Sequence, residues 1–211
     1  MAKRGRKSIA NERRAQILEA FRVCAVRKGL EKASLREIAG EAGLPLSNLL
    51  HFFKNRDEMV RGLEKQIIGD IMEDLETDLR DEGDPQRRFR RIIDFLFSPR
   101  AQKLEDGSLY YDFWSLAHRS RALRRTFQNQ IRDQRKLFVE QLLDCDAFSA
   151  LSKTDAQEIA NIMIALVEGS FYVLDMDGEN VSPKGMARIT RRFLELYAAE
   201  KMREKRAKED Q

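Results

Sequence analysis

The stretch from residue 34 to residue 59, SLREIAGEAGLPLSNLLHFFKNRDEM, constrains the fold of this chain more than any other part. Ser34 can cap a helix, and Glu37 three residues later completes a capping box. Gly43 stands where that helix must end in a sharp turn that favours a positive φ. Pro45 can start a second helix, because the first turn does not use its missing N–H. The pattern predicts two short helices joined by a tight turn.

Both predicted helices have one apolar face. The first face is formed by Leu35, Ile38, Ala39 and Ala42, and the inward face of the second by Leu49, Leu50 and Phe53. A helix, a glycine-containing turn and a second short helix make up a helix-turn-helix, which places its second helix in a DNA major groove. The alternative is a structural corner in another type of helical protein.

The charge distribution separates the N-terminal part from the rest. Residues 1–56 contain 13 Lys and Arg against 5 Asp and Glu, whereas the remaining residues contain 26 against 30. A basic segment attached to a slightly acidic body is typical of a DNA-binding domain on a body that does not bind DNA. The alternative, that Lys and Arg simply decorate helix surfaces, explains the body better than the N-terminal segment.

The spacing of apolar residues predicts an all-α protein of about nine helices, with no stretch of sustained strand alternation. The expected helices are two within 34–53 and others at about 8–28, 55–79, 85–97, 108–118, 121–143, 155–174 and from 183 onwards, with a less regular segment at 98–107. Thr154 and Gln157 are expected to form the capping box of the helix at 155–174. The charged tail from Glu200 is expected to fray. The predicted domains are 1–56 for DNA binding, 57–200 for ligand binding and dimerisation, and 201–211 as a charged tail.

Several classes of function lack support in the sequence. Cys24 and Cys145 are far apart, and the two histidines form no metal-ligand pattern. No glycine-rich phosphate loop and no G-x-S-x-G motif is present. We therefore expect no enzyme activity, no metal and no cofactor. The N-terminus has no apolar segment of a secretory signal, and the longest purely apolar run is 162–167. These features favour a cytoplasmic, nucleoid-associated protein without a membrane partner.

Residues 38–44, Ile-Ala-x-x-Ala-Gly-Leu, and 49–59, Leu-x-x-Phe-Phe-Lys-Asn-Arg-Asp-Glu-Met, resemble the N-terminal domain of TetR-type transcriptional repressors. The resemblance covers roughly residues 10–60. In the body, residues 113–127 and 164–171 are faintly similar to the betaine-synthesis repressor branch of that family. The resemblance implies a homodimer in which the last two long helices, the eighth and ninth predicted, pair with those of a second subunit. The alternative for the eighth helix is the central helix of a monomer.

The resemblance implies that the chain reads a palindromic operator in double-stranded DNA. The expected DNA-binding residues are Leu46, Ser47, Asn48 and His51 on the second helix of the motif, Lys54 and Arg56 after it, Arg36 before it, and Arg4 and Arg6 in the basic arm. Leu50 replaces a tyrosine that commonly contacts phosphate in the family, so His51 or Ser47 is expected to take over that contact. The alternative for His51 is partial burial against the first helix.

The resemblance also implies a small-molecule effector bound in the body. The candidate lining residues are Tyr110, Tyr111, Phe113, Trp114, His118, Glu168 and Phe171. An aromatic cage with a carboxylate suits a quaternary-ammonium ligand, so the effector is expected to be aromatic-caged or cationic. The alternative is that the aromatic residues are core and Glu168 an interface residue. A second hypothesis for the whole protein is a DNA-anchored protein-interaction module without a small-molecule ligand.

Overall fold

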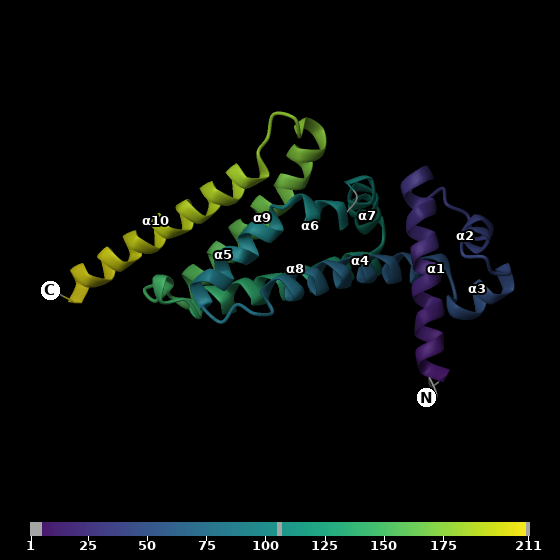
Figure 1. Ribbon diagram of the computed structural model, residues 1–211, viewed down its shortest axis with the longest axis horizontal. Coiled ribbons are helices and arrows are strands. Elements are labelled where there is room, and N and C mark those ends of the chain that lie inside the picture. Colours follow the sequence, from purple (N-terminus) through teal and green to yellow (C-terminus); the bar gives the residue numbers. More distant parts are fainter. Residues whose placement is uncertain (1–5, 105–106, 210–211) are drawn as a thin grey trace. The chain divides into compact units, whose positions relative to one another are not determined.

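The computed structural model describes residues 6–104 and 107–209, and every regular element in these residues is helical. The helices are α1 Arg6–Lys28, α2 Leu35–Glu41, α3 Leu46–Phe52, α4 Arg56–Leu79, α5 Pro85–Leu96, α6 Pro99–Leu104, α7 Gly107–Arg119, α8 Arg121–Leu143, α9 Lys153–Asp177 and α10 Pro183–Glu209, with a 3-10 turn at Asp146–Phe148 (Figure 1). The predicted all-α class is confirmed.

The helices fall into two compact units. The first contains α1, α2, α3, α7, α4 as far as Met72 and α8 as far as Thr126. The second contains α5, α6, α9, α10 and the remaining parts of α4 and α8. The two units are defined by packing and not by function. The functional domains 1–56, 57–200 and 201–211 therefore stay predictions.

In the first unit, α2 and α3 lie against the same helix, α1 (Figure 1). Ser34 caps α2 by accepting from the Glu37 N–H at 3.3 Å, and the Glu37 carboxylate accepts from the Ser34 N–H at 2.9 Å. Gly43 adopts a φ of +63°, so the predicted glycine turn between α2 and α3 is confirmed. The apolar faces converge on one core whose fully buried members include Ile17, Phe21, Leu30, Ile38, Leu49, Phe53, Met59 and Leu63.

Leu50 is the exception among the residues predicted to face inward, since it is 47% exposed. Leu49 and Phe53 are four residues apart and share the buried face of α3, whereas Leu50 is about 100° further round the helix. A helix of two turns has only one face against α1 and α2. Leu50 therefore lies on the solvent side, together with the polar residues of α3.

Three other local predictions were wrong. The segment predicted to be less regular contains the short helix α6. The capping box of α9 is formed by Ser152 and Asp155, two residues earlier than predicted, and the Asp155 N–H donates to Ser152 Oγ at 3.1 Å. The charged tail does not fray at Glu200 but continues α10 to Glu209, because Lys201 pairs with Glu204 one turn along and with Asp155 of α9.

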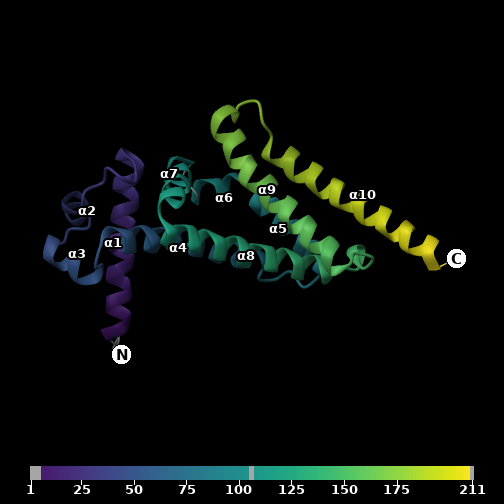
Figure 2. The same ribbon diagram turned by 180° about the vertical axis from the view of Figure 1, so that it is seen from behind.

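In the second unit, α9 and α10 form a helical hairpin that both views show (Figures 1 and 2). Each helix has a buried side, with Ala160 and Met163 on α9 and Leu194 and Ala198 on α10, and α10 packs against α5 and the 3-10 turn. Large apolar side chains also lie on the solvent side of the hairpin. They are Ile162, Leu166, Tyr172, Val173 and Met176 on α9, and Ile189, Phe193 and Leu196 on α10.

By length and composition α9 could also cross a membrane, although only 33% of its most apolar window is buried. A helix of a soluble protein passes the same test. Its exposed apolar residues continue onto α10, a helix interspersed with Lys, Arg and Glu. Exposed apolar patches of this kind occur at sites that bind a protein or a membrane.

Candidate nucleic-acid interface and effector site

The solvent side of α3 carries the polar residues predicted to read DNA. Ser47, Asn48 and His51 are exposed, and Leu46 is half-buried. The ring of His51 packs edge-on against Phe52 with centroids 5.5 Å apart. Amide and hydroxyl groups on an exposed helix face can bond base edges in a major groove. The arrangement is therefore chemically suited to base contacts, with Leu50 adding an apolar contact.

Arg14 of α1 holds the C-terminal end of α3 in place. Its guanidinium donates to the Phe52 carbonyl, forms an ion pair of 2.9 Å with Glu58, and lies 4.2 Å from the centre of the Phe53 ring. Glu58 also accepts from the Lys54 N–H at 2.9 Å. That hydrogen bond and the bond from Arg14 lower the pKa of Glu58. Arg14 thus fixes α3 against α1, a role that no local sequence pattern indicates because its partners lie 38 and 44 residues away.

Arg56, predicted to contact phosphate, makes its contacts within the protein. The guanidinium donates to the carbonyls of Leu30 and Ala33, in the turn between α1 and α2, and lies 5.5 Å from the centre of the Phe21 ring. Burial lowers its pKa. These contacts tie the start of α4 to that turn.

The other cations predicted to contact DNA are placed differently. The side chains of Lys54 and Arg36 are exposed, and neither has an ion pair in the described part of the chain. Arg4 lies outside the described residues. Arg6 is the first residue of α1, and its side chain is not described. Lys54 and Arg36 are therefore the described cations of the predicted set that are open to phosphate.

Single substitutions of Lys54 and Arg56 are expected to have different effects, the first on DNA affinity and the second on the stability of the fold. Lys54→Ala should weaken binding to all duplexes and reduce the salt slope by about one, because one phosphate contact is lost. Arg56→Ala should instead lower the free energy of unfolding by about 2 kcal/mol, because two carbonyls lose a charged donor. Salt-dependent gel shifts and urea denaturation measure the two effects. An unchanged unfolding midpoint for Arg56→Ala would contradict the positioning role.

The α7 helix is bonded to the same turn between α1 and α2. The Leu30 N–H donates to the Asp112 carboxylate, and Arg119 lies 3.5 Å from Glu31. Gly29, with a φ of +89°, ends α1 at this point, and an added Cβ there would lie 3.5 Å from the Asp112 carboxylate. Asp112 is thus a structural link that the sequence did not reveal, because its partner is 82 residues away.

The aromatic residues predicted to bind a ligand divide between core and surface on α7. Phe113 is buried, whereas Trp114 is 56% exposed. Trp114 lies against His118 with ring centroids 4.3 Å apart, and His118 Nδ1 is 3.0 Å from the Trp114 carbonyl. Tyr110 and Tyr111 are half-buried and meet edge-on at 5.4 Å. The core alternative therefore describes Phe113, whereas Trp114 and His118 form an exposed pair with tilted rings.

Glu168 and Phe171 are half-buried on α9 and belong to the second unit, whereas the five α7 residues belong to the first. Their joint role in one ligand site stays a prediction. The described residues contain no cluster of three His, Cys, Asp or Glu that could hold a metal ion.

Glu64 on α4 is a buried carboxylate that was not among the predicted site residues. It is 4% exposed and has no hydrogen-bond or ion-pair partner in the described part of the chain. Burial raises its pKa to about 7. Its position four residues after the buried Val60 and three before the buried Ile67 was a signal of an inward-facing acid.

Glu64 should make stability depend on pH. Between its ordinary pKa of 4.5 and the folded value of about 7, the native state holds a proton that the unfolded chain has lost. The contribution of Glu64 to the free energy of unfolding is therefore largest below pH 4.5. It is lost as the pH rises through 7, which lowers the free energy of unfolding by about 2–3 kcal/mol in all. Urea denaturation from pH 5 to pH 8 should show that Glu64→Gln removes this fall. The exposed Glu73→Gln should retain it, and a wild-type slope in Glu64→Gln would contradict the assignment.

Comparisons with known proteins agree with this geometry. The family model described as "Tetracyclin repressor-like, C-terminal domain" matches residues 84–192. The chain is 23% identical over 188 residues to the HTH-type transcriptional regulator BetI of Paraburkholderia phytofirmans, an alignment that covers 89% of this chain and 94% of BetI.

Two solved structures share the fold. A protein from Pseudomonas aeruginosa PAO1, described as a transcriptional regulator, superposes with a TM-score of 0.79 at 22% identity, covering 90% of this chain and 91% of that one. A second, from Saccharomonospora viridis, was solved in complex with choline and superposes with a TM-score of 0.72 at 19% identity, covering 88% and 96%.

Proposed function

Because this chain belongs to the TetR family of transcriptional regulators, which bind DNA, we propose that it is a repressor released from a palindromic operator by a small-molecule effector. The observation that carries the DNA-binding part is the exposed polar face of α3, held against α1 by Arg14. Ser47, Asn48 and His51 are proposed to contact bases, and Lys54 and Arg36 to contact phosphates.

A homodimer is proposed to form through α9 and α10, the eighth and ninth helices of the sequence prediction. The exposed apolar residues of both helices support this surface, because eight large apolar side chains on one hairpin would otherwise remain in water. Two α3 helices related by a two-fold axis would read half-sites about 34–36 Å apart, or a multiple of that distance. Regulators of this family typically act as dimers.

The effector is proposed to act through α7. This helix holds the α1–α2 turn through Asp112, and Arg56 of α4 holds the same turn. A ligand that shifts α7 or α4 would therefore change the contacts that hold the α1–α2 turn, and with them the position of the helix-turn-helix. A coupling of about 1–3 kcal/mol between the two sites would suffice for regulation.

A cationic effector is favoured over a neutral one. Glu64 is a buried carboxylate without a partner in the described residues, and Trp114 with His118 offers an aromatic face. The choline complex of the structural relative from Saccharomonospora viridis supports the same class of ligand.

Selection of the bound sequence from a random duplex library, followed by gel shifts in a salt series, tests the DNA-binding part. A palindromic consensus and a steep loss of affinity with salt are expected. Equal affinity for all duplexes would overturn the proposal of a specific repressor. Calorimetric titration with choline tests the effector part. The absence of measurable binding heat, together with unchanged operator affinity in the presence of choline, would favour the interaction-module alternative.

A further inference from the structure

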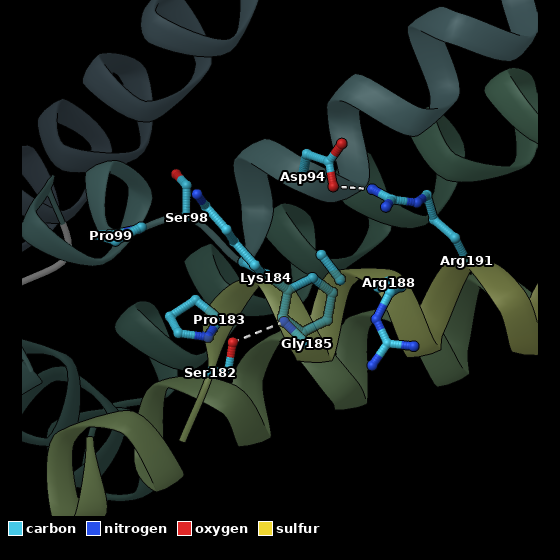
Figure 3. A pocket seen from close by; sticks show the side chains of 11 residues that line it. Asp94, Ser98, Pro99, Ser182, Pro183, Lys184, Gly185, Arg188 and Arg191 are labelled. Carbon is cyan, nitrogen blue, oxygen red and sulfur yellow. Dashed lines mark hydrogen bonds and ion pairs between the residues drawn. The ribbon is translucent and has the colours of Figure 1, made fainter. Parts of the chain in front are cut away.

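A pocket of about 710 Å³ lies within the second unit, where the end of α5 and the start of α6 meet the first turns of α10 (Figure 3). Its volume falls in the range of small-molecule sites. It is lined by Asp94, Phe97 and Ser98 from one side and by Lys184, Ala187 and Arg188 among others from α10. None of the residues predicted to bind the effector lines it.

The lining is positively charged. It contains Lys184, Arg188 and Arg191 against a single carboxylate, Asp94. Asp94 and Arg191 form an ion pair and so neutralise each other. Lys184 and Arg188 are exposed and have no ion pair in the described part of the chain. In Figure 3 the side chain of Lys184 points toward Ser98 across the pocket. Two cations therefore remain uncompensated at one cavity.

The start of α10 adds a weaker positive potential. Its first turn is capped, because Ser182 Oγ accepts from the Gly185 N–H at 3.1 Å and the Ser182 carbonyl accepts from the Met186 N–H at 2.9 Å. The partial positive charge at the N-terminus of this long helix still favours an anion nearby. The side chains of Lys184 and Arg188 are the groups that would bond it directly.

The deeper wall of the pocket is apolar. Phe97 and Ala187 are 3% and 2% exposed, and Pro99 and Pro183 also line the cavity. A bare inorganic ion would leave this wall in water. The two cations and the apolar wall together favour a ligand with an anionic head and a short apolar body.

Dimerisation through the proposed surface would leave this pocket open. On α10 the lining positions 184, 187, 188 and 191 share one face, and the exposed apolar positions 189, 193 and 196 share another. At 3.6 residues per turn, the centres of these two faces are roughly 150° apart around the helix.

We propose that this pocket binds a small organic anion, a carboxylate or a phosphate ester with a short apolar body, through Lys184 and Arg188. The proposal is independent of the DNA-binding function and of the cationic effector, because its residues belong to neither site.

Isothermal titration of the full chain with octanoate and with phenyl phosphate tests the proposal, with octyltrimethylammonium as the cationic comparison. At least one of the two anions should bind, whereas the cation should not bind in this pocket. Lys184→Gln/Arg188→Gln should weaken anion binding about tenfold, because two charged donors are lost. The matched control Arg203→Gln/Lys205→Gln removes two exposed cations from the far turns of α10 and should leave binding unchanged.

A third variant gives a change of opposite sign. Asp94→Asn removes the partner of Arg191 and should strengthen anion binding about threefold, because a third cation becomes available. Thermal melts followed by circular dichroism confirm that each variant is folded. Failure of both anions to bind at millimolar concentration would overturn the proposal, and so would wild-type affinity in the Lys184→Gln/Arg188→Gln variant or weaker binding in Asp94→Asn.

Discussion

Phe193→Arg is expected to convert the protein to monomers and to weaken binding to a palindromic operator at least about a hundredfold. Phe193 is 60% exposed on α10, in the same row as Ile189 and Leu196. In the proposed dimer this row faces the partner, so a guanidinium at its centre would be buried without a counter-charge. Each monomer would then bind one half-site alone. In the dimer, by contrast, binding of one α3 raises the effective concentration of the second α3 at the other half-site.

Light scattering after size-exclusion chromatography measures the oligomeric state, and gel shifts on a full and a half operator measure the affinity. Ala199→Arg is the matched control, because it adds the same side chain at an exposed position of α10 outside the apolar row. A Phe193→Arg protein that remained dimeric with wild-type operator affinity would show that the partner binds elsewhere.

Ser47→Ala/Asn48→Ala is expected to reduce affinity for the operator by about 2–5 kcal/mol and to leave binding to unrelated duplexes nearly unchanged. Both side chains are exposed on α3, and neither has a hydrogen-bonded side-chain partner in the described residues. Their loss would remove base contacts. The phosphate contacts proposed for Lys54 and Arg36 would remain and would maintain non-specific binding.

Competition gel shifts with operator and unrelated DNA measure the specificity ratio. Lys54→Ala is the contrasting variant, since it should lower both affinities together and preserve the ratio. If Ser47→Ala/Asn48→Ala retained the wild-type ratio, α3 would not be the helix that reads the sequence.

The predictions that the structure confirmed depend on neighbours in the sequence. The Ser34–Glu37 capping box and the positive φ of Gly43 each involve residues within one turn of each other. The buried face of α1, with Ile17, Phe21 and others, follows from the helical period. Such features are legible in a single sequence, because a helix places i, i+3 and i+4 together whatever the rest of the chain does.

The predictions that were wrong or incomplete depend on how much of each helix is covered. Leu50 satisfies the apolar pattern, but α3 has only one face against its neighbours. The tail after Glu200 is charged enough to fray, yet Lys201 reaches Asp155 on α9. Glu64 follows the apolar period of α4, but its charge is typical of a surface acid, and the packing around α4 is what buries it.

By itself the sequence determined the all-α class, the helix-turn-helix and the resemblance to TetR-type regulators, because these rest on local spacing, capping and the pattern of residues 38–59. Only the tertiary structure decided which side chains are free to act. Arg56 bonds carbonyls 23 and 26 residues away, Asp112 bonds an amide 82 residues away, and Arg191 pairs with Asp94 across 97 residues. Contacts across such separations depend on how helices pack, and no local pattern in one sequence encodes them.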